Sequence, residues 1–281
     1  MKRAFKQLAK QLLSWGYFLQ RRGIVQQKVI LLGHMRCGSS LMVHILTSNP
    51  DIAGYGETHL DYDSIADLEK LATNIYFTLR RIRPSRLVLD KILHNEYLKS
   101  DQILLAKSCI FPIMAREAIS SVRSMVTSLP GRLRQTNPHS EDLLTMAADY
   151  YRRRLDTLFH YAEALASLGR CWYFTYDDLV ERSAKVFRML EHCLELSHPL
   201  SESYTIGPKT GIHGYGDPSD NIKRGYIDRA IVRTSIAIPE RLAETLTEHY
   251  RSFDKQMRGI SSCDTGASAR SLVDDNNQYA T

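Results

Sequence analysis

The sequence contains no long apolar segment. None of its 281 residues belongs to a run that approaches the ~18 consecutive apolar positions of a membrane-spanning helix, so we do not expect an integral membrane protein. The N-terminus also lacks the continuous apolar core of a secretory signal, and we expect a cytoplasmic protein. With 43% hydrophobic and 24% charged residues, the composition is that of a globular protein, which excludes disorder as the main state.

Cysteine is scarce and scattered. The cysteines form no C-x-x-C pair and are five in number (Cys37, Cys109, Cys171, Cys193 and Cys263). An odd, dispersed set argues against a disulfide framework and against a zinc site, and it indicates a reducing compartment. We therefore expect no metal in this protein.

Acidic residues are missing from the first 50 positions, which carry eight Lys or Arg and no Asp or Glu. The rest of the chain holds 29 basic and 31 acidic residues, so the net charge of +6 comes from the N-terminal end. Residues 3–20 place apolar side chains at helical spacings (Phe5, Leu8, Leu12, Trp15 and Leu19). We expect this helix to pack on the domain. The alternative is peripheral contact with an anionic membrane through residues 1–22.

Short apolar runs and helical patterns alternate along most of the chain. The runs predict strands at 28–33, 86–89, 108–115 and 171–176, although Pro112 is unfavourable inside a central strand. The helical patterns predict helices at 39–48, 141–168 (capped by Ser140) and 178–196. This alternation predicts an α/β fold with three layers, in which helices flank a mainly parallel central sheet.

The chain divides into three parts. We expect a basic helix and linker at 1–27, a single domain at 28–260 and a disordered tail at 261–281, where the residues are small and polar. Residues 199–225 are rich in Gly, Pro, Ser and Asp without periodicity, and such a length of irregular chain predicts a functional loop.

The first predicted strand leads into a phosphate-binding pattern that lacks its lysine. Gly33-His-Met-Arg-Cys-Gly-Ser-Ser40 has the G-x-x-x-x-G spacing of a nucleoside-triphosphate loop, with Ser39 where lysine belongs. That lysine neutralises the β- and γ-phosphates, so its absence disfavours a Mg²⁺–triphosphate site. The loop still offers backbone N–H groups and a helix N-terminus to an anion.

This segment resembles the 5′-phosphosulfate loop of sulfotransferases that use 3′-phosphoadenylyl sulfate (PAPS), which reads approximately P-[KR]-S-G-[TS]-[TS]-[LW]. The resemblance implies the P-loop-like sulfotransferase fold, PAPS as the donor without a metal, and a loop that holds its 5′-phosphate (Arg36, Cys37, Gly38, Ser39 and Ser40). Two positions depart from the pattern, because Met35 stands where the family usually has Pro and Cys37 where it usually has Ser.

Further motifs of the family follow at the expected separations. The family binds the 3′-phosphate with an Arg at a strand end and a Ser eight residues later, and Arg116 and Ser124 have that spacing. Tyr176-Asp-Asp-Leu179 is similar to the family's Y-E-D-L and implies a donor contact for Tyr176. Residues 216–225 resemble the loop that closes over the nucleotide, which implies that Lys223 or Arg224 reaches the 3′-phosphate. The Arg116–Glu117 pair lacks the customary proline.

The resemblance also implies the catalytic residues. Glu57 is placed like the general base of protein-tyrosine and some carbohydrate sulfotransferases, and Lys91 would stabilise the transferring group. His94 is the rival base, because the small-molecule branch uses a His shortly after such a Lys, and His59 is a weaker candidate. We favour Glu57.

The predicted function is transfer of a sulfuryl group from PAPS to a hydroxyl or amine. We expect a small-molecule, glycan or lipid-linked acceptor, such as a glycolipid or a secondary metabolite, and no nucleic acid. Two alternatives stay open. One is a kinase with a degenerate phosphate loop, which Ser39 disfavours, and the other is a non-catalytic nucleotide- or membrane-binding module.

Overall fold

The computed structural model describes residues 26–80, 84–128, 131, 133, 142–212, 220–230 and 236–262. The predicted helix at 3–20, the predicted cap at Ser140 and almost all of the predicted tail lie outside the described residues. None of the described helices is both long enough and apolar enough to cross a membrane.

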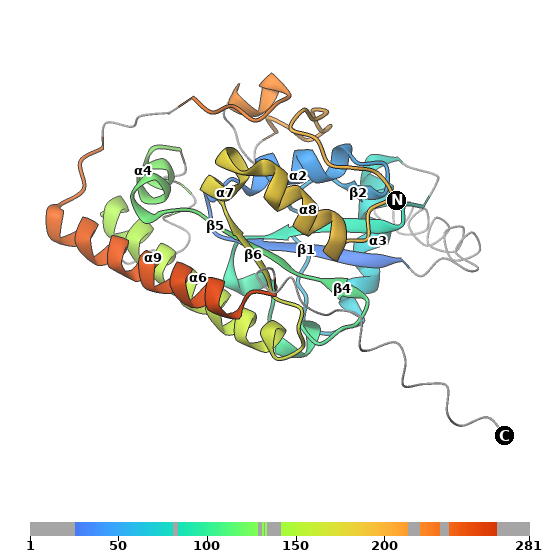
Figure 1. Cartoon of the computed structure of the whole chain (residues 1–281), viewed down its shortest axis with the longest axis horizontal. Helices are drawn as coiled ribbons and strands as arrows, with labels where there is room; N and C mark the ends of the chain where they lie inside the picture. The colour runs from blue at the N-terminus through green and yellow to red at the C-terminus, as the bar shows by residue number, and fades with distance from the viewer. Residues whose placement is uncertain are drawn as a thin grey trace, which may run out of the picture.

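A parallel sheet of six described strands forms the centre of the molecule (Figure 1). Its order is β2-β3-β1-β5-β6, with β4 also paired to β1, and every pairing between these strands is parallel. The strands are β1 (Gln27–Gly33), β2 (Ile52–Gly54), β3 (Leu87–Ile92), β4 (Cys109–Ile110), β5 (Pro112–Ala115) and β6 (Trp172–Thr175). The predicted parallel sheet is therefore confirmed.

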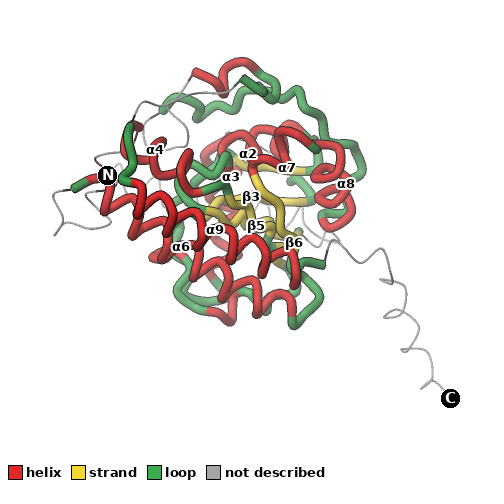
Figure 2. The backbone as a smooth tube through the Cα atoms, turned by 60° about the vertical axis from the view of Figure 1, so that its left-hand side comes forward, coloured by secondary structure: helices red, strands yellow, loops and turns green. Residues whose placement is uncertain are grey.

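Helices cover both faces of the sheet, as a chain of alternating strands and helices requires (Figures 1 and 2). Val29 and Leu31 of β1 face one helical layer, formed by α2 (Ser39–Ser48), α7 (Tyr176–Glu181) and α8 (Ser183–Cys193). Ile30 and Leu32 face the other, formed by α4 (Ala118–Ser128), α6 (Leu143–Ala166) and α9 (Glu240–Ile260). The helix α3 (Asp67–Leu79) packs on β2 and β3. Because both faces of β1 are buried, its sequence is a continuous apolar run.

Three predicted elements need correction. The strand predicted at 108–115 is two short strands separated by Phe111, and Pro112 begins β5, a position where its missing N–H is tolerated. The helix predicted at 178–196 is two helices, because Arg182 leaves the helical conformation with φ −133° and ψ 38°. The long helix begins at Leu143, where the Asp142 carboxylate caps it by accepting the N–H groups of Leu144 and Thr145.

The segment predicted as a functional loop lies along α2. The Thr205 N–H donates to Ser48 Oγ (2.7 Å), and the Asn49 amide donates to the carbonyl of His198 (2.8 Å). Residues 213–219 lie outside the described ranges, and the segment continues with the short helix η3 (Asp220–Arg224).

Candidate active site

The loop between β1 and α2 has the form of an anion-binding loop. Gly38 is the N-cap of α2 with φ 93°, and no acidic residue lies in the first turn of this helix. A side chain at Gly38 would collide with the ring of Tyr176, so only glycine fits both the backbone conformation and the space. The first N–H groups of α2 therefore meet no capping side chain from Gly38, and the positive end of the helix faces the loop.

Four of the predicted donor-site residues converge beside this loop from different elements. Arg36, with φ 66°, donates from Nε to Ser124 Oγ on α4 (2.8 Å). Arg116, just after β5, stacks its guanidinium on the ring of Tyr176 at 4.2 Å from the centroid. Since the Tyr176 ring also borders Gly38, these contacts join the predicted 5′- and 3′-phosphate residues into one polar surface.

A second cluster lies where β3 ends. Lys91 Nζ is 3.2 Å from the Glu57 carboxylate and donates to Ser40 Oγ on α2 (3.1 Å). The Lys91 side chain is 1% exposed and that of Glu57 17% exposed, so the ammonium is buried and the carboxylate lies nearer the surface. The structure thus brings the predicted lysine and the favoured base together at the start of α2.

Asp90, which the sequence analysis did not single out, holds the segment that carries Glu57. Its buried carboxylate accepts hydrogen bonds from the backbone N–H of Thr58 (2.9 Å), the Thr58 hydroxyl and the Tyr62 hydroxyl (2.7 Å). Burial raises the pKa of Asp90, and the bonds from Thr58 and Tyr62 oppose that shift. An acid inside the apolar run of β3 was the signal that could have identified it.

His94 lies in a different environment from Glu57. It is 3% exposed, and its ring packs against those of Tyr150 and Tyr97 at centroid distances of 5.5 and 6.2 Å. His59 is exposed, has φ 54°, and lies beside Tyr97. Neither histidine shares the contact that joins Glu57 to Lys91.

The remaining predicted donor residues are either buried or located on η3. Cys37 is fully buried in the core and Ser39 is 3% exposed, and their predicted contacts with the 5′-phosphate stay predictions. Lys223 and Arg224 are exposed on η3, where Arg224 pairs with Asp228. Their predicted contact with the 3′-phosphate stays a prediction.

The structure explains two departures from the sulfotransferase pattern. The Met35 N–H, which a proline would lack, donates to the hydroxyl of Tyr150 (2.9 Å). The Glu117 carboxylate, at the position before α4, accepts the N–H groups of Ile119 (2.7 Å) and Ser120 (2.6 Å) and so caps this helix. Both substitutions gain a hydrogen bond that proline would not make.

His34 connects the loop to the end of β5. The fully buried ring hydrogen-bonds through Nδ1 to the Met35 carbonyl (2.8 Å) and accepts the Arg116 N–H at Nε2 (3.0 Å). Burial lowers the pKa of His34 to about 4, and the charges of Arg154 and Arg116 act in the same direction. The imidazole is therefore neutral at pH 7, with its proton on Nδ1.

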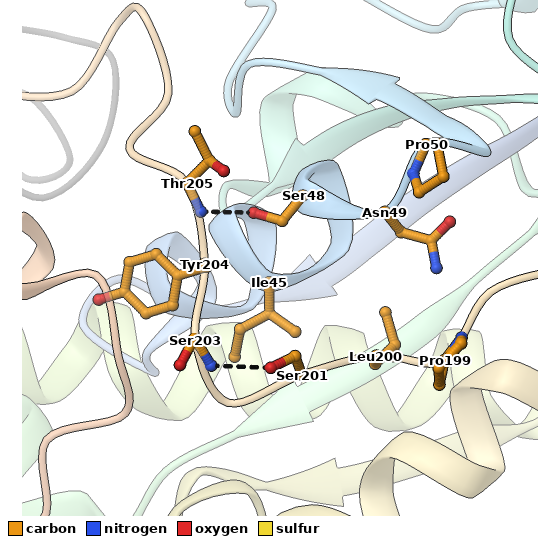
Figure 3. Close-up of a pocket in the computed structure, with 10 residues that line it drawn as sticks. All are labelled: Ile45, Ser48, Asn49, Pro50, Pro199, Leu200, Ser201, Ser203, Tyr204 and Thr205. Atoms are coloured by element: carbon orange, nitrogen blue, oxygen red, sulfur yellow. Dashed lines mark hydrogen bonds between the residues drawn. The ribbon is translucent and has the colours of Figure 1, made fainter.

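A cavity of about 370 Å³ lies at the C-terminal end of α2, away from the predicted site residues (Figure 3). Its walls come from the end of α2 and from residues 199–205, and Ser48 and Thr205 meet across it. A helix of ten residues is ~15 Å long, so this cavity and the anion-binding loop are at opposite ends of α2. No predicted site residue lines it.

In the described part of the chain, no three His, Cys, Asp or Glu side chains are grouped to hold a metal ion.

The fold is similar to that of a solved sulfotransferase domain. A sulfotransferase domain from the curacin biosynthetic pathway is 17% identical with a TM-score of 0.54, and the match covers 83% of this chain and 98% of that domain. The mouse sulfotransferase SULT7A1, solved with PAP, is 14% identical with a TM-score of 0.42, over 83% of this chain and 88% of that one. No family model and no curated protein sequence matches this chain. The chain has the sulfotransferase fold, as the phosphosulfate-like loop predicts.

Proposed function

We propose that this protein transfers a sulfuryl group from PAPS to a hydroxyl or amine of an acceptor. The observation that carries the proposal is the Lys91 ammonium, which lies within 3.2 Å of Glu57 and 3.1 Å of Ser40 at the start of α2. A carboxylate, a buried cation and an anion-binding helix end are the groups that such a transfer needs.

The donor site fits the chemistry of PAPS. The N-terminus of α2 suits the 5′-phosphate because it offers N–H groups and a positive dipole end with no acidic residue in its first turn. Arg116 and Ser124 are proposed to bind the 3′-phosphate, and Arg36 of the loop donates a hydrogen bond to Ser124. When bound, PAPS would supply an activated sulfuryl group whose bond to the 5′-phosphate oxygen breaks.

Glu57 is proposed as the general base. Its carboxylate takes the proton of the acceptor hydroxyl as the acceptor oxygen forms its bond to sulfur and PAP leaves. Lys91 lies 3.2 Å from this carboxylate, and with PAPS bound its positive charge would stabilise the leaving phosphate oxygen. Asp90 fixes the same segment through Thr58, so the Glu57 segment is attached to β3 at two neighbouring residues, Asp90 and Lys91. His94, enclosed by Tyr97 and Tyr150, is less suited to take this proton.

The acceptor is proposed to be a glycolipid, a glycan or a secondary metabolite. A second cavity, of about 190 Å³, lies between α2, the end of β2 and residues 205–210. Its lining includes Tyr55, which lies two residues before Glu57. The lining also includes the apolar side chains of Leu79 and Ile206 and the polar side chains of His44 and Lys209. A wall that mixes apolar and polar side chains favours an amphipathic acceptor over a purely polar sugar.

Ligand-induced thermal stabilisation tests the donor, because a ligand that binds only the native state raises the melting temperature. We expect PAP to stabilise the protein and ATP with Mg²⁺ to leave it unchanged. Stabilisation by ATP–Mg²⁺ without stabilisation by PAP would establish the kinase alternative instead. An acceptor screen with isotopically labelled PAPS, read by product mass, then separates the enzyme from a non-catalytic binding module.

A further inference from the structure

The buried face of α6 carries polar side chains behind the candidate site. Tyr150, Tyr151 and Arg154 are 6%, 0% and 1% exposed. Polar groups at this depth require hydrogen-bond partners, and a buried guanidinium needs several. All three side chains bond to the backbone at the end of a central strand or just after it. Tyr151, for example, donates to the carbonyl of Arg116 after β5 (2.7 Å).

Arg154 joins the ends of β1 and β3. Its Nε donates to the carbonyl of Gly33 (2.8 Å) and its Nη2 to the carbonyl of Ile92 (2.9 Å), while Nη1 donates to the Asn95 side chain (2.7 Å). The β1–β3 ladder ends at the pair Leu32 and Ile92, so Arg154 binds the two strands where their own pairing stops. The rigid, planar guanidinium fixes the direction of each donor.

Tyr150 makes the same connection one helical turn earlier. Its hydroxyl accepts the Met35 N–H from the anion-binding loop (2.9 Å) and donates to the carbonyl of Leu93 (2.6 Å). Leu93 follows β3 directly, two residues after Lys91. A single hydroxyl thus bridges the loop and the end of the strand that carries the lysine.

We infer that Tyr150 and Arg154 are positioning residues, which set the distance between the anion-binding loop and Lys91. The inference rests on the proposed function, because that distance matters only if the loop holds a donor on which Lys91 acts. Neither side chain is placed to touch the reacting atoms. Both act through the backbone of Gly33, Met35, Ile92 and Leu93, and a small displacement of either strand end would separate Lys91 from Ser40.

The sharpest test is Tyr150→Phe, which removes one hydroxyl and keeps the ring that packs against His94. Its matched control is Tyr173→Phe, on β6. Tyr173 is 4% exposed, and its hydroxyl donates to the carboxylate of Asp254 on α9 (2.8 Å), outside both clusters. If buried tyrosines only stabilise the core, the two variants should show the same donor binding.

We expect Tyr150→Phe to weaken PAP binding by about fivefold, the equivalent of one hydrogen bond, and to lower kcat, while Tyr173→Phe stays within about twofold of wild type in both. Titration calorimetry gives the affinity, and steady-state rates with a sulfated-product readout give kcat and KM. Equal PAP affinity and kcat in Tyr150→Phe and wild type would overturn the inference.

Arg154→Lys adds a second measurement, because lysine keeps the charge and loses the planar fork. We expect a folded variant, judged by its thermal transition, with weaker PAP binding than wild type; unchanged binding in it would also contradict the inference. If Arg154→Lys does not fold, Tyr150→Phe decides alone. If wild type itself does not bind PAP, the proposed function is overturned and this inference falls with it, an outcome distinct from a difference between variants.

Discussion

At the scale of single residues, the candidate site depends on charged side chains that the fold places next to an opposite charge or a hydrogen-bond acceptor. Lys91 is an ammonium in a core position, and such a group needs a carboxylate or hydrogen-bond acceptors to stay charged there. Glu57 and Ser40 supply both at 3.2 and 3.1 Å. The Glu57 carboxylate therefore has two functions in our proposal: it balances Lys91 and it takes the proton from the acceptor.

Replacing Glu57 by Gln tests the second function. Glutamine keeps the size and an oxygen that can accept a hydrogen bond from Lys91, but it cannot take a proton at neutral pH. We expect kcat to fall by about 10²–10⁴, the usual contribution of a general base, with PAP affinity within about threefold of wild type. The comparison variant is His94→Gln. Activity that survives Glu57→Gln and disappears in a folded His94→Gln protein would assign the base to His94.

Arg116 allows a test of the 3′-phosphate site. We expect Arg116→Ala to weaken PAP binding and to leave binding of AMP, which has no 3′-phosphate, nearly unchanged, because the lost guanidinium would face only that group. Arg123→Ala is the matched control, since Arg123 lies on α4 and donates to the carbonyl of Ile236. An equal loss for PAP and AMP in calorimetry would place Arg116 elsewhere in the site.

At the scale of elements, three contacts constrain the start of α2. Its N-cap is a glycine with φ 93°, packed against the Tyr176 ring at the start of α7, and its first turn carries the serine that Lys91 contacts. A change at this point would move the helix end that is proposed to bind the donor.

We expect Gly38→Ala to destabilise the protein by at least ~1 kcal/mol, since alanine is strained at this φ and its Cβ would displace Tyr176. We also expect the stabilisation by PAP to be lost. Gly259→Ala is the control, because Gly259 lies inside α9 with open space around its Cβ position and should gain up to ~1 kcal/mol. Chemical denaturation with and without PAP measures both effects. A Gly38→Ala protein with undiminished PAP stabilisation would contradict this role.

At the scale of the whole molecule, His34 links stability to pH. In the folded state its pKa is lowered to about 4 from 6.5, so between these values the unfolded chain binds a proton that the folded protein does not. The stability from this group is present above pH 6.5 and is lost as the pH falls toward 4.

We expect the His34 contribution to the free energy of unfolding to fall by about 2 kcal/mol between pH 7 and pH 5. Urea denaturation of wild type and His34→Gln over this range isolates it, because glutamine can also donate to the Met35 carbonyl and accept the Arg116 N–H. We expect a smaller decrease in the variant. The same decrease in both proteins would mean that other groups cause the pH dependence.

The sequence predicted best those features of the structure that depend on residues close together in the chain. The apolar run of β1, the loop from Gly33 to Ser40 and the helix after it were predictable, because hydrophobic periodicity and glycine spacing are local. The ends of longer elements were not. The Asp142 cap was missed because Ser140 and Asp142 are both favoured capping residue types, and the break at Arg182, β2, α3 and α9 were not predicted at all.

The sequence by itself determined the class of fold and the form of the loop between β1 and α2, since glycine spacing and a missing lysine can be identified without knowledge of spatial neighbours. Only the tertiary structure decided which side chains contact one another. Lys91 meets Glu57 and Ser40, and Arg36 meets Ser124, because a parallel sheet brings the carboxyl ends of distant strands to one edge. Nothing in the sequence pointed to Tyr150 and Arg154. Their proposed role depends on the backbone groups that they contact, and those contacts are set by how α6 packs on the sheet.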